Sequence, residues 1–286
     1  MFALVRPLTR RLVQRVAPFL LLLLALLVAG PGTSATADTP SGRHWHATTK
    51  PTIVLVHGAW ADGSSWRGVV HRLQSRGYPV RVPAVTLRSL ASDAINLSNL
   101  VSTISGPVVL VGHSYGGAVI TNMPTDPDVT ALVFVNGFAP AAGEELAALS
   151  GPDSALAVSD PTTVFDFVPY TGGPAGDVEI YLKQDIFRTA FASDLPTRRA
   201  DMLWATQRPI TFSALHEPSA APAWASVPSW YAVGDRDLIL PPAAQAAMAQ
   251  RAGSAIRTVR AGHLSHVSRP GAVTAIIDEA ATETRD

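Results

Sequence analysis

The sequence predicts an α/β fold in which a mostly parallel sheet is covered by helices on both faces. Six short apolar segments alternate with helix-like segments along most of the chain, and such alternation gives parallel strands joined by crossover helices. Three of these segments end in turns that carry a serine, a pair of aspartates and a histidine. Because the carboxyl ends of parallel strands meet at one edge of a sheet, we expect these side chains to form one site.

The predicted strands are short runs rich in Val, Ile and Leu. They are Thr52–His57, Val80–Val82, Val108–Val111, Ala131–Val135, Ser229–Val233 and Ile256–Val259. A chain of 286 residues can form one large α/β domain, and no internal repeat divides it. We therefore predict a single domain over residues 51–286 that contains an insertion.

The insertion is predicted between Phe138 and Pro209, where about 70 residues contain no clear strand. Helix-like segments at 143–149, 177–192 and 196–206 predict a helical cap over residues 139–208. The cap is rich in aromatic residues, and some of them must pack it onto the core. Together with Trp60 from the core, residues such as Trp204 predict a small, apolar, largely enclosed pocket.

The first 37 residues are predicted to be a signal peptide. Arginines precede the apolar run Phe19–Ala29, and small residues ending in Ala35-Thr-Ala37 follow it, so cleavage is expected after Ala37. The apolar run is shorter than the roughly 20 residues of a spanning helix, which disfavours a retained anchor. The twin arginine Arg10-Arg11 is followed by a poor match to the twin-arginine pattern, which favours Sec export. A polar leader, residues 38–50, then precedes the domain.

The charges of the chain balance, with 22 Lys and Arg against 22 Asp and Glu. A protein that binds nucleic acid through its phosphates needs a basic surface, so no nucleic-acid partner is expected. No stable membrane association is expected after signal cleavage either, and the oligomeric state stays open. The absence of cysteine excludes disulfides, so an exported protein depends on its core for stability.

The segment Gly112-His-Ser-Tyr-Gly-Gly117 predicts a nucleophile elbow centred on Ser114. It follows the apolar run Val108–Val111 and precedes a helix-like segment. A serine can stand at the tip of a strand only if the turn around it is tight, which requires small residues two positions before and two positions after it. Gly112 and Gly116 meet this requirement, so Ser114 is predicted to be the nucleophile of an acyl transfer.

A serine nucleophile needs a histidine base and an acid that orients it, and both are expected further along the chain. Asp235 and Asp237 stand in the loop after one predicted strand. Asp237 is preferred because it lies at the far end of the loop, whereas Asp235 adjoins Arg236. His263 follows the last strand and a small-residue turn, so it is the predicted base; His266 is the alternative.

The other histidines have simpler interpretations. We expect His113 to pack under the elbow and His71 to lie on a helix surface. His44 and His46 form a His-x-His pair in the leader, but a metal site needs further ligands that this neighbourhood does not offer. We therefore predict no metal site and no cofactor.

Two backbone N–H groups are expected to stabilise an oxyanion beside the serine. Tyr115 supplies one because it directly follows Ser114. The other is assigned to Ala59, in the small-residue loop after the first strand.

Taken together, these segments resemble the α/β-hydrolase superfamily over about residues 51–281. The chain is most similar to a small branch that includes plant methylesterases, hydroxynitrile lyases and many bacterial hydrolases. The likeness is carried by His57-Gly-Ala-Trp60, Gly112–Gly117, Leu132–Val135 with Phe138–Pro140, Arg208-Pro-Ile210, Pro228–Tyr231, and the His263 turn with Pro270 seven residues on.

The resemblance implies the same roles, with Ser114 as nucleophile, Asp237 as acid, His263 as base, and Ala59 and Tyr115 as oxyanion donors. The lyases of this branch place a threonine at the position of Gly58 and a lysine at that of Leu264. Cyanohydrin cleavage is therefore not expected.

The sequence thus predicts a secreted or periplasmic serine esterase that cleaves carboxylic esters or lactones of small to medium apolar compounds through an acyl-enzyme. One alternative is a cofactor-free perhydrolase with the same triad. Another is a receptor-like protein that uses the capped pocket to hold a ligand, although an intact triad argues against it.

Overall fold

The computed structural model describes residues 50–284, and within them a six-stranded parallel sheet has the strand order β2-β1-β3-β4-β8-β9. All the predicted core strands are present. They are β1 (Thr52–Val56), β2 (Val80–Arg81), β3 (Val108–His113), β4 (Val129–Val135), β8 (Ser229–Gly234) and β9 (Ala255–Val259). The predicted signal peptide and the leader up to residue 49 lie outside the described residues.

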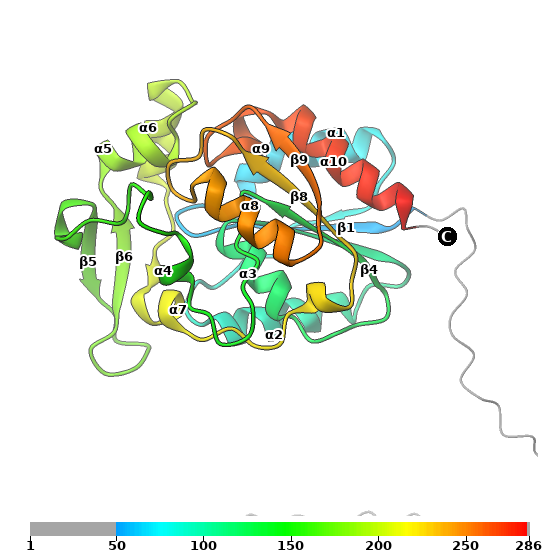
Figure 1. Cartoon of the computed structure of the whole chain (residues 1–286), viewed down its shortest axis with the longest axis horizontal. Helices are drawn as coiled ribbons and strands as arrows, with labels where there is room; N and C mark the ends of the chain where they lie inside the picture. Colours follow the sequence, from blue (N-terminus) through cyan, green and yellow to red (C-terminus); the bar gives the residue numbers. More distant parts are fainter. Residues whose placement is uncertain (1–49, 285–286) are drawn as a thin grey trace, which may run out of the picture. The chain divides into compact units, whose positions relative to one another are not determined.

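Both faces of this sheet are buried, as expected for parallel strands joined by helices. Along β1, Ile53 and Leu55 belong to one core cluster and Val54 and Val56 to the other. Helices α1 (Arg67–Ser75) and α10 (Pro270–Glu283) cover the first face, and α2 (Leu90–Val101), α3 (Tyr115–Asn122) and α8 (Pro242–Arg251) cover the second (Figure 1). Two short helices, η1 (Gly63–Trp66) and α9 (Ser265–Ser268), lie in the connections.

The segment between β4 and β8 forms the cap. Its described helices are α4 (Leu146–Leu149), η2 (Pro161–Thr163), α5 (Gln184–Ile186), η3 (Phe187–Phe191), α6 (Thr197–Ala205), α7 (Phe212–His216) and η4 (Ala223–Ala225). It also contains an antiparallel sheet of β5 (Phe165–Pro169), β6 (Val178–Leu182) and β7 (Ile210–Thr211). Figure 1 shows β5, β6, α5 and α6 at one end of the domain, beyond the carboxyl ends of the core strands.

The prediction of a purely helical cap is therefore wrong in part. Residues 178–182 form a strand in which Ile180 and Leu182 are buried and alternate with less buried neighbours. This alternation has the period of two that is typical of a strand, but it covers few residues and a helix follows almost at once, so the sequence pattern favours a helix. The predicted helix at 143–149 starts only at Leu146, because Gly143 has a φ of +81°. The helix predicted at 196–206 is confirmed as α6.

Among the described residues, no helix combines the length and the apolar character that crossing a bilayer would need.

Candidate active site

The predicted nucleophile elbow has the strained geometry that its glycines allow. Ser114 links β3 to α3 with φ +50° and ψ −122°, an unusual backbone conformation for a residue with a side chain. A Cβ atom on Gly112 would lie 2.4 Å from the Gly116 carbonyl oxygen, and a Cβ on Gly116 would lie 2.4 Å from that of Val56. The small residues on both sides of the serine are therefore required by close backbone contacts.

The elbow is fixed by its surroundings. The Ser114 carbonyl accepts hydrogen bonds from the N–H groups of Gly117, at 2.9 Å, and Phe138, at 3.0 Å. Gly58 approaches from the loop after the neighbouring strand β1, and a Cβ there would lie 2.7 Å from Ser114 Cβ and 2.9 Å from the His113 carbonyl oxygen. The serine thus sits in a closely packed frame formed by the ends of three segments.

The structure brings the predicted acid and base together. His263 Nδ1 lies 2.8 Å from Asp237 Oδ2, and both side chains are buried. Since a carboxylate only accepts, Nδ1 carries the proton and Nε2 remains a free acceptor in the neutral ring. Asp235 lies in the same loop but is exposed. The loop after β8 therefore places Asp237, and not Asp235, against the histidine.

The Asp237 carboxylate has an extensive set of hydrogen bonds. Its Oδ1 accepts from the N–H groups of Ile239 and Leu240, each at 2.9 Å. Its Oδ2 accepts from Asn136 Nδ2 and Gln245 Nε2, each at 2.9 Å, in addition to His263. A buried carboxylate with this many donors is held in one orientation.

Asn136 and Gln245 both contact the Asp237 carboxylate, and neither is among the residues predicted from the sequence. Asn136 follows β4 with a φ of +44°. Its side chain also donates, at 3.3 Å, to the carbonyl of Gly262, which is the residue before His263. Gln245 is fully buried on α8. A polar residue at the carboxyl end of a core strand was the available signal for Asn136. Gln245 has no comparable local signature.

His263 Nε2 is buried and has no hydrogen-bond partner among the described residues, so the bond to Ser114 is not formed in this structure. Catalytic hydrogen bonds are often long before substrate binds and tighten in the complex. His263 is nevertheless held beside the elbow, because the Nε2–H of His113, the residue before Ser114, donates to the His263 carbonyl at 3.0 Å.

The alternative base, His266, lies in a buried aromatic cluster. Its ring centroid is 4.2 Å from that of His113 and 4.4 Å from that of Trp66. Neither ring nitrogen has a hydrogen-bond partner among the described residues. Burial, reinforced by neighbouring His263, lowers the pKa of His266 to about 3. His266 therefore stays neutral. The carboxylate of Asp237 accepts a hydrogen bond from His263 and not from His266. His71 is exposed, as predicted.

The buried His266 predicts acid sensitivity of the fold. The unfolded chain binds a proton near the ordinary histidine pKa, whereas the folded protein does so only at about 3. Between these values the unfolded state holds more protons, so the free energy of unfolding falls as pH falls, by at most about 5 kcal/mol from this residue. Chemical denaturation between about pH 7 and about pH 4 measures how much of the free energy of unfolding is lost. This loss should be smaller in His266→Phe than in the wild type or in the exposed control His71→Phe. An equal loss in all three proteins would contradict the assignment.

The two residues predicted as oxyanion donors, Ala59 and Tyr115, both lie beside the elbow. Tyr115 is the first residue of α3, so its N–H has no partner within the helix. The Ala59 N–H donates no hydrogen bond to another described residue. Both residues line the same cavity as Ser114. Two free N–H groups beside a serine hydroxyl can stabilise a tetrahedral oxyanion.

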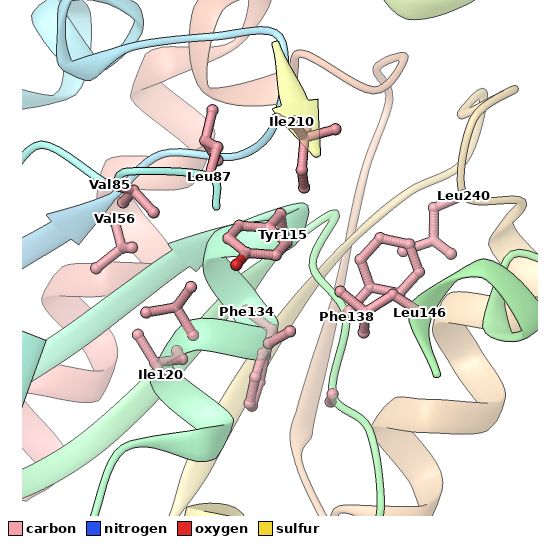
Figure 2. Close-up of a cluster of buried hydrophobic side chains, with 14 of the residues drawn as sticks. Val56, Val85, Leu87, Tyr115, Ile120, Phe134, Phe138, Leu146, Ile210 and Leu240 are labelled. Carbon is pink, nitrogen blue, oxygen red and sulfur yellow. The ribbon is translucent and has the colours of Figure 1, made fainter. Parts of the chain in front are cut away.

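The Tyr115 side chain anchors this region to the core. Its hydroxyl donates to Asp93 Oδ2 at 3.0 Å, and the same carboxylate accepts from the backbone of Thr86 and Leu87. Burial raises the pKa of Tyr115 well above its usual value, so the phenol remains a neutral donor. Figure 2 shows its ring among buried residues from the sheet and the cap, such as Phe134 and Ile210.

The loop that carries Ala59 is tied down by His57. The Val85 N–H donates to His57 Nε2 at 3.1 Å, so Nδ1 carries the proton and donates to the Gly58 carbonyl at 2.9 Å. Burial lowers the pKa of His57, which favours this neutral form. The histidine therefore holds the loop that carries Ala59 in place.

A cavity of about 260 Å³ opens at Ser114. Its lining is mostly apolar and comes from both the core and the cap: Ala59, Trp60, Ser114, Tyr115, Phe138, Leu146, Ala147, Ser150, Gly151, Ser154, Leu156, Ala157, Pro161, Phe165, Phe167, Ile180, Phe212, Leu215, His216 and Ile239. Figure 2 labels two of these lining residues, Phe138 and Leu146, within the buried hydrophobic cluster. His216 is a lining residue that the sequence reasoning did not consider.

The two tryptophans predicted for the pocket have different places. Trp60 lines the cavity, stacks on Phe165 at 5.9 Å, and donates to the Ile180 carbonyl at 2.9 Å. Trp204 does not line it, which corrects the prediction. The indole N–H of Trp204 donates to the Leu182 carbonyl at 3.0 Å, so this ring joins α6 to β6 within the cap.

Within residues 50–284, no group of three or more His, Cys, Asp or Glu side chains is arranged to hold a metal ion. The His44 and His46 pair, for which no metal site is predicted, lies outside the described residues.

Comparison with known proteins agrees with this architecture. The model of the alpha/beta hydrolase family matches residues 53–276. The alpha/beta hydrolase nvfD of Aspergillus novofumigatus is 29% identical over 262 residues, which cover 82% of this chain and 98% of that protein. The carbendazim hydrolyzing esterase of a Nocardioides species is 34% identical over 111 residues, covering 34% of this chain and 46% of the esterase.

The solved structure of a pyrethroid hydrolase from Sphingobium faniae superposes with a TM-score of 0.63, at 22% identity over 82% of this chain and 98% of that one. This structural likeness shows the α/β-hydrolase fold. Because the family model spans most of the chain, the chain belongs to the alpha/beta hydrolase family and is an enzyme of the hydrolase class.

Proposed function

We propose that this hydrolase is a serine esterase that cleaves carboxylic esters or lactones of small to medium apolar compounds. The observation that carries the proposal is the buried Asp237–His263 pair, 2.8 Å apart, beside an elbow serine that opens into an apolar cavity. In the proposed triad Ser114 is the nucleophile, His263 the base and Asp237 the acid.

In the first half of the reaction, His263 Nε2 takes the proton of Ser114 Oγ as this oxygen attacks the substrate carbonyl carbon. Asp237 stabilises the imidazolium that forms and keeps its Nδ1–H in place. The carbonyl oxygen becomes an oxyanion that accepts hydrogen bonds from the N–H groups of Ala59 and Tyr115. The imidazolium then donates its proton to the leaving alkoxide, and the acyl group remains on Ser114.

Water hydrolyses this acyl-enzyme by the same route in reverse. His263 removes a proton from the water, the hydroxide attacks the acyl carbon, and Ser114 regains its proton when the carboxylic acid departs. All of these proton transfers use a single histidine nitrogen.

The cavity supports a small, apolar substrate. Its lining contains Trp60, Phe165 and Phe167, and its volume of about 260 Å³ is at the small end for ligand pockets. The similarity to a carbendazim hydrolyzing esterase and to a pyrethroid hydrolase is consistent with a small-molecule substrate.

Turnover of p-nitrophenyl esters of increasing acyl length tests this proposal. Each added methylene should raise kcat/KM by up to about fourfold, from roughly 0.8 kcal/mol of burial, until the cavity is full, and the trend should then reverse. The optimum is expected at short acyl chains, without activation by an oil–water interface.

Two alanines on α4 offer a matched control. Both are exposed, but Ala147 lines the cavity and Ala148 does not. Ala147→Phe should move the optimum to shorter chains, whereas Ala148→Phe should leave it unchanged. Absence of any turnover would refute the esterase, and a steady rise in kcat/KM towards long-chain triglycerides would refute the closed pocket.

We further propose that the protein is exported and its signal peptide is removed after Ala37. The support is the basic N-terminus, the apolar run and the Ala35-Thr-Ala37 tract. Mass spectrometry of protein from the medium or periplasm is expected to find an N-terminus at Asp38. Full-length chain in the membrane fraction would show a retained anchor instead.

A further inference from the structure

The cavity contains few polar groups that are free to bind a ligand. No Asp, Glu, Lys or Arg is among the described residues that line it. Trp60 Nε1 donates to the Ile180 carbonyl at 2.9 Å, the Tyr115 hydroxyl to Asp93 at 3.0 Å, and Ser154 Oγ to the Ile239 carbonyl at 2.7 Å. Apart from the nucleophile, the side chains of Ser150 and His216 remain.

His216 is held in one orientation at the end of α7. Its Nδ1 lies 2.9 Å from the Phe212 carbonyl oxygen, and its ring stacks on the Phe212 ring with centroids 3.9 Å apart and planes inclined by 21°. Since a carbonyl only accepts, Nδ1 carries the proton, and Nε2 of the neutral ring is an acceptor. Nε2 has no hydrogen-bond partner among the described residues.

His216 and Ser114 line the cavity from different parts of the fold. Ser114 comes from the end of β3 in the core, whereas His216 comes from α7 in the cap, next to α4 (Figure 1). A substrate with its ester at Ser114 can therefore place another group against the cap. A group that donates a hydrogen bond would pair with Nε2, whereas an apolar group there would leave this acceptor unpaired.

We propose that His216 is a specificity-determining residue that accepts a hydrogen bond from a hydroxyl group carried by the substrate away from its scissile ester. The preferred substrate class is then a hydroxylated ester or lactone with an otherwise apolar skeleton. This inference rests on the proposed esterase function and names the substrate of the same site.

The test compares p-nitrophenyl esters of ω-hydroxy acids with esters that carry a methyl group in place of the hydroxyl, over a series of chain lengths. Discrimination is the ratio of the two kcat/KM values. His216→Asn keeps a donor for the Phe212 carbonyl but has no atom at the Nε2 position, and His216→Gln restores an acceptor there. We expect His216→Asn to lower discrimination by about fivefold at one chain length or more, and His216→Gln to recover most of it.

His71→Asn, at an exposed position on α1, is the control and should leave discrimination unchanged. The inference is overturned if His216→Asn lowers both kcat/KM values equally at every chain length, because that result indicates a structural role only. It is also overturned if His216→Gln behaves like His216→Asn.

Failure of the esterase function is distinguishable from failure of this inference. If the wild type hydrolyses neither ester, the proposed function is wrong. Calorimetry then measures the Kd values of two amides, one made from the hydroxylated acid and one from its methyl counterpart, and these values decide the inference. The hydroxylated amide should bind the wild type more tightly than His216→Asn, with no such difference for its methyl counterpart; equal Kd values for the hydroxylated amide would overturn the inference.

Discussion

Replacing Ser114 with alanine is expected to lower kcat for p-nitrophenyl esters by on the order of 10⁴-fold or more and to leave the protein folded. The chemistry is lost because Ser114 is the only serine of the elbow among the described residues that line the cavity. The fold is retained because alanine keeps the Cβ atom that the backbone already accommodates at φ +50°.

Non-additivity is the control for this prediction. If Ser114 and His263 act as one unit, adding His263→Ala to Ser114→Ala should reduce the residual rate no further. Unfolding curves of the single variant should overlay those of the wild type. A Ser114→Ala protein that keeps a tenth of the wild-type kcat would show that the nucleophile lies elsewhere.

Replacing Asp237 with asparagine is expected to cost about 10⁴-fold in kcat. The carboxylate accepts five hydrogen bonds from described groups, so an amide NH₂ in either orientation faces donors. If the amide nitrogen faces His263 Nδ1, the imidazole must carry its proton on Nε2 instead. That nitrogen can then no longer take the proton of Ser114.

Asp235→Asn is the matched control, because Asp235 lies two residues away in the same loop and is exposed. It should change kcat by less than roughly tenfold. The decisive measurement is the kcat of the two purified variants side by side. A larger loss in Asp235→Asn than in Asp237→Asn would reverse the assignment of the acid.

The core of this fold could be predicted from sequence because its signals are local. Each core strand is a short apolar run, and the elbow needs Gly112 and Gly116 at fixed positions where backbones pass too closely for a Cβ. The pairing of Asp237 with His263 followed from topology, since both stand after strands whose carboxyl ends meet at one edge.

The parts that were missed depend on tertiary contacts. Gln245 is a buried polar residue in a helix, and only the folded chain shows that it donates to Asp237. The strand β6 is short and is followed almost directly by a helix, so the sequence pattern of this segment predicts a helix. Trp204 is a large aromatic residue of the cap, as expected for a pocket residue, yet its indole N–H donates a hydrogen bond to the backbone of β6 instead.

The packing of Gly58 against the elbow limits how the chemistry of this protein could change through mutation. Hydroxynitrile lyases of the related branch carry a threonine at this position, but here a Cβ would meet Ser114 Cβ at 2.7 Å and the His113 carbonyl oxygen at 2.9 Å. Real Cβ contacts are not that short, so a single Gly58→Thr substitution would displace Ser114, the proposed nucleophile, as well as adding a hydroxyl. A route from this esterase framework to a lyase must therefore widen the gap between the two strand ends first, which makes it a path of several mutations and not one.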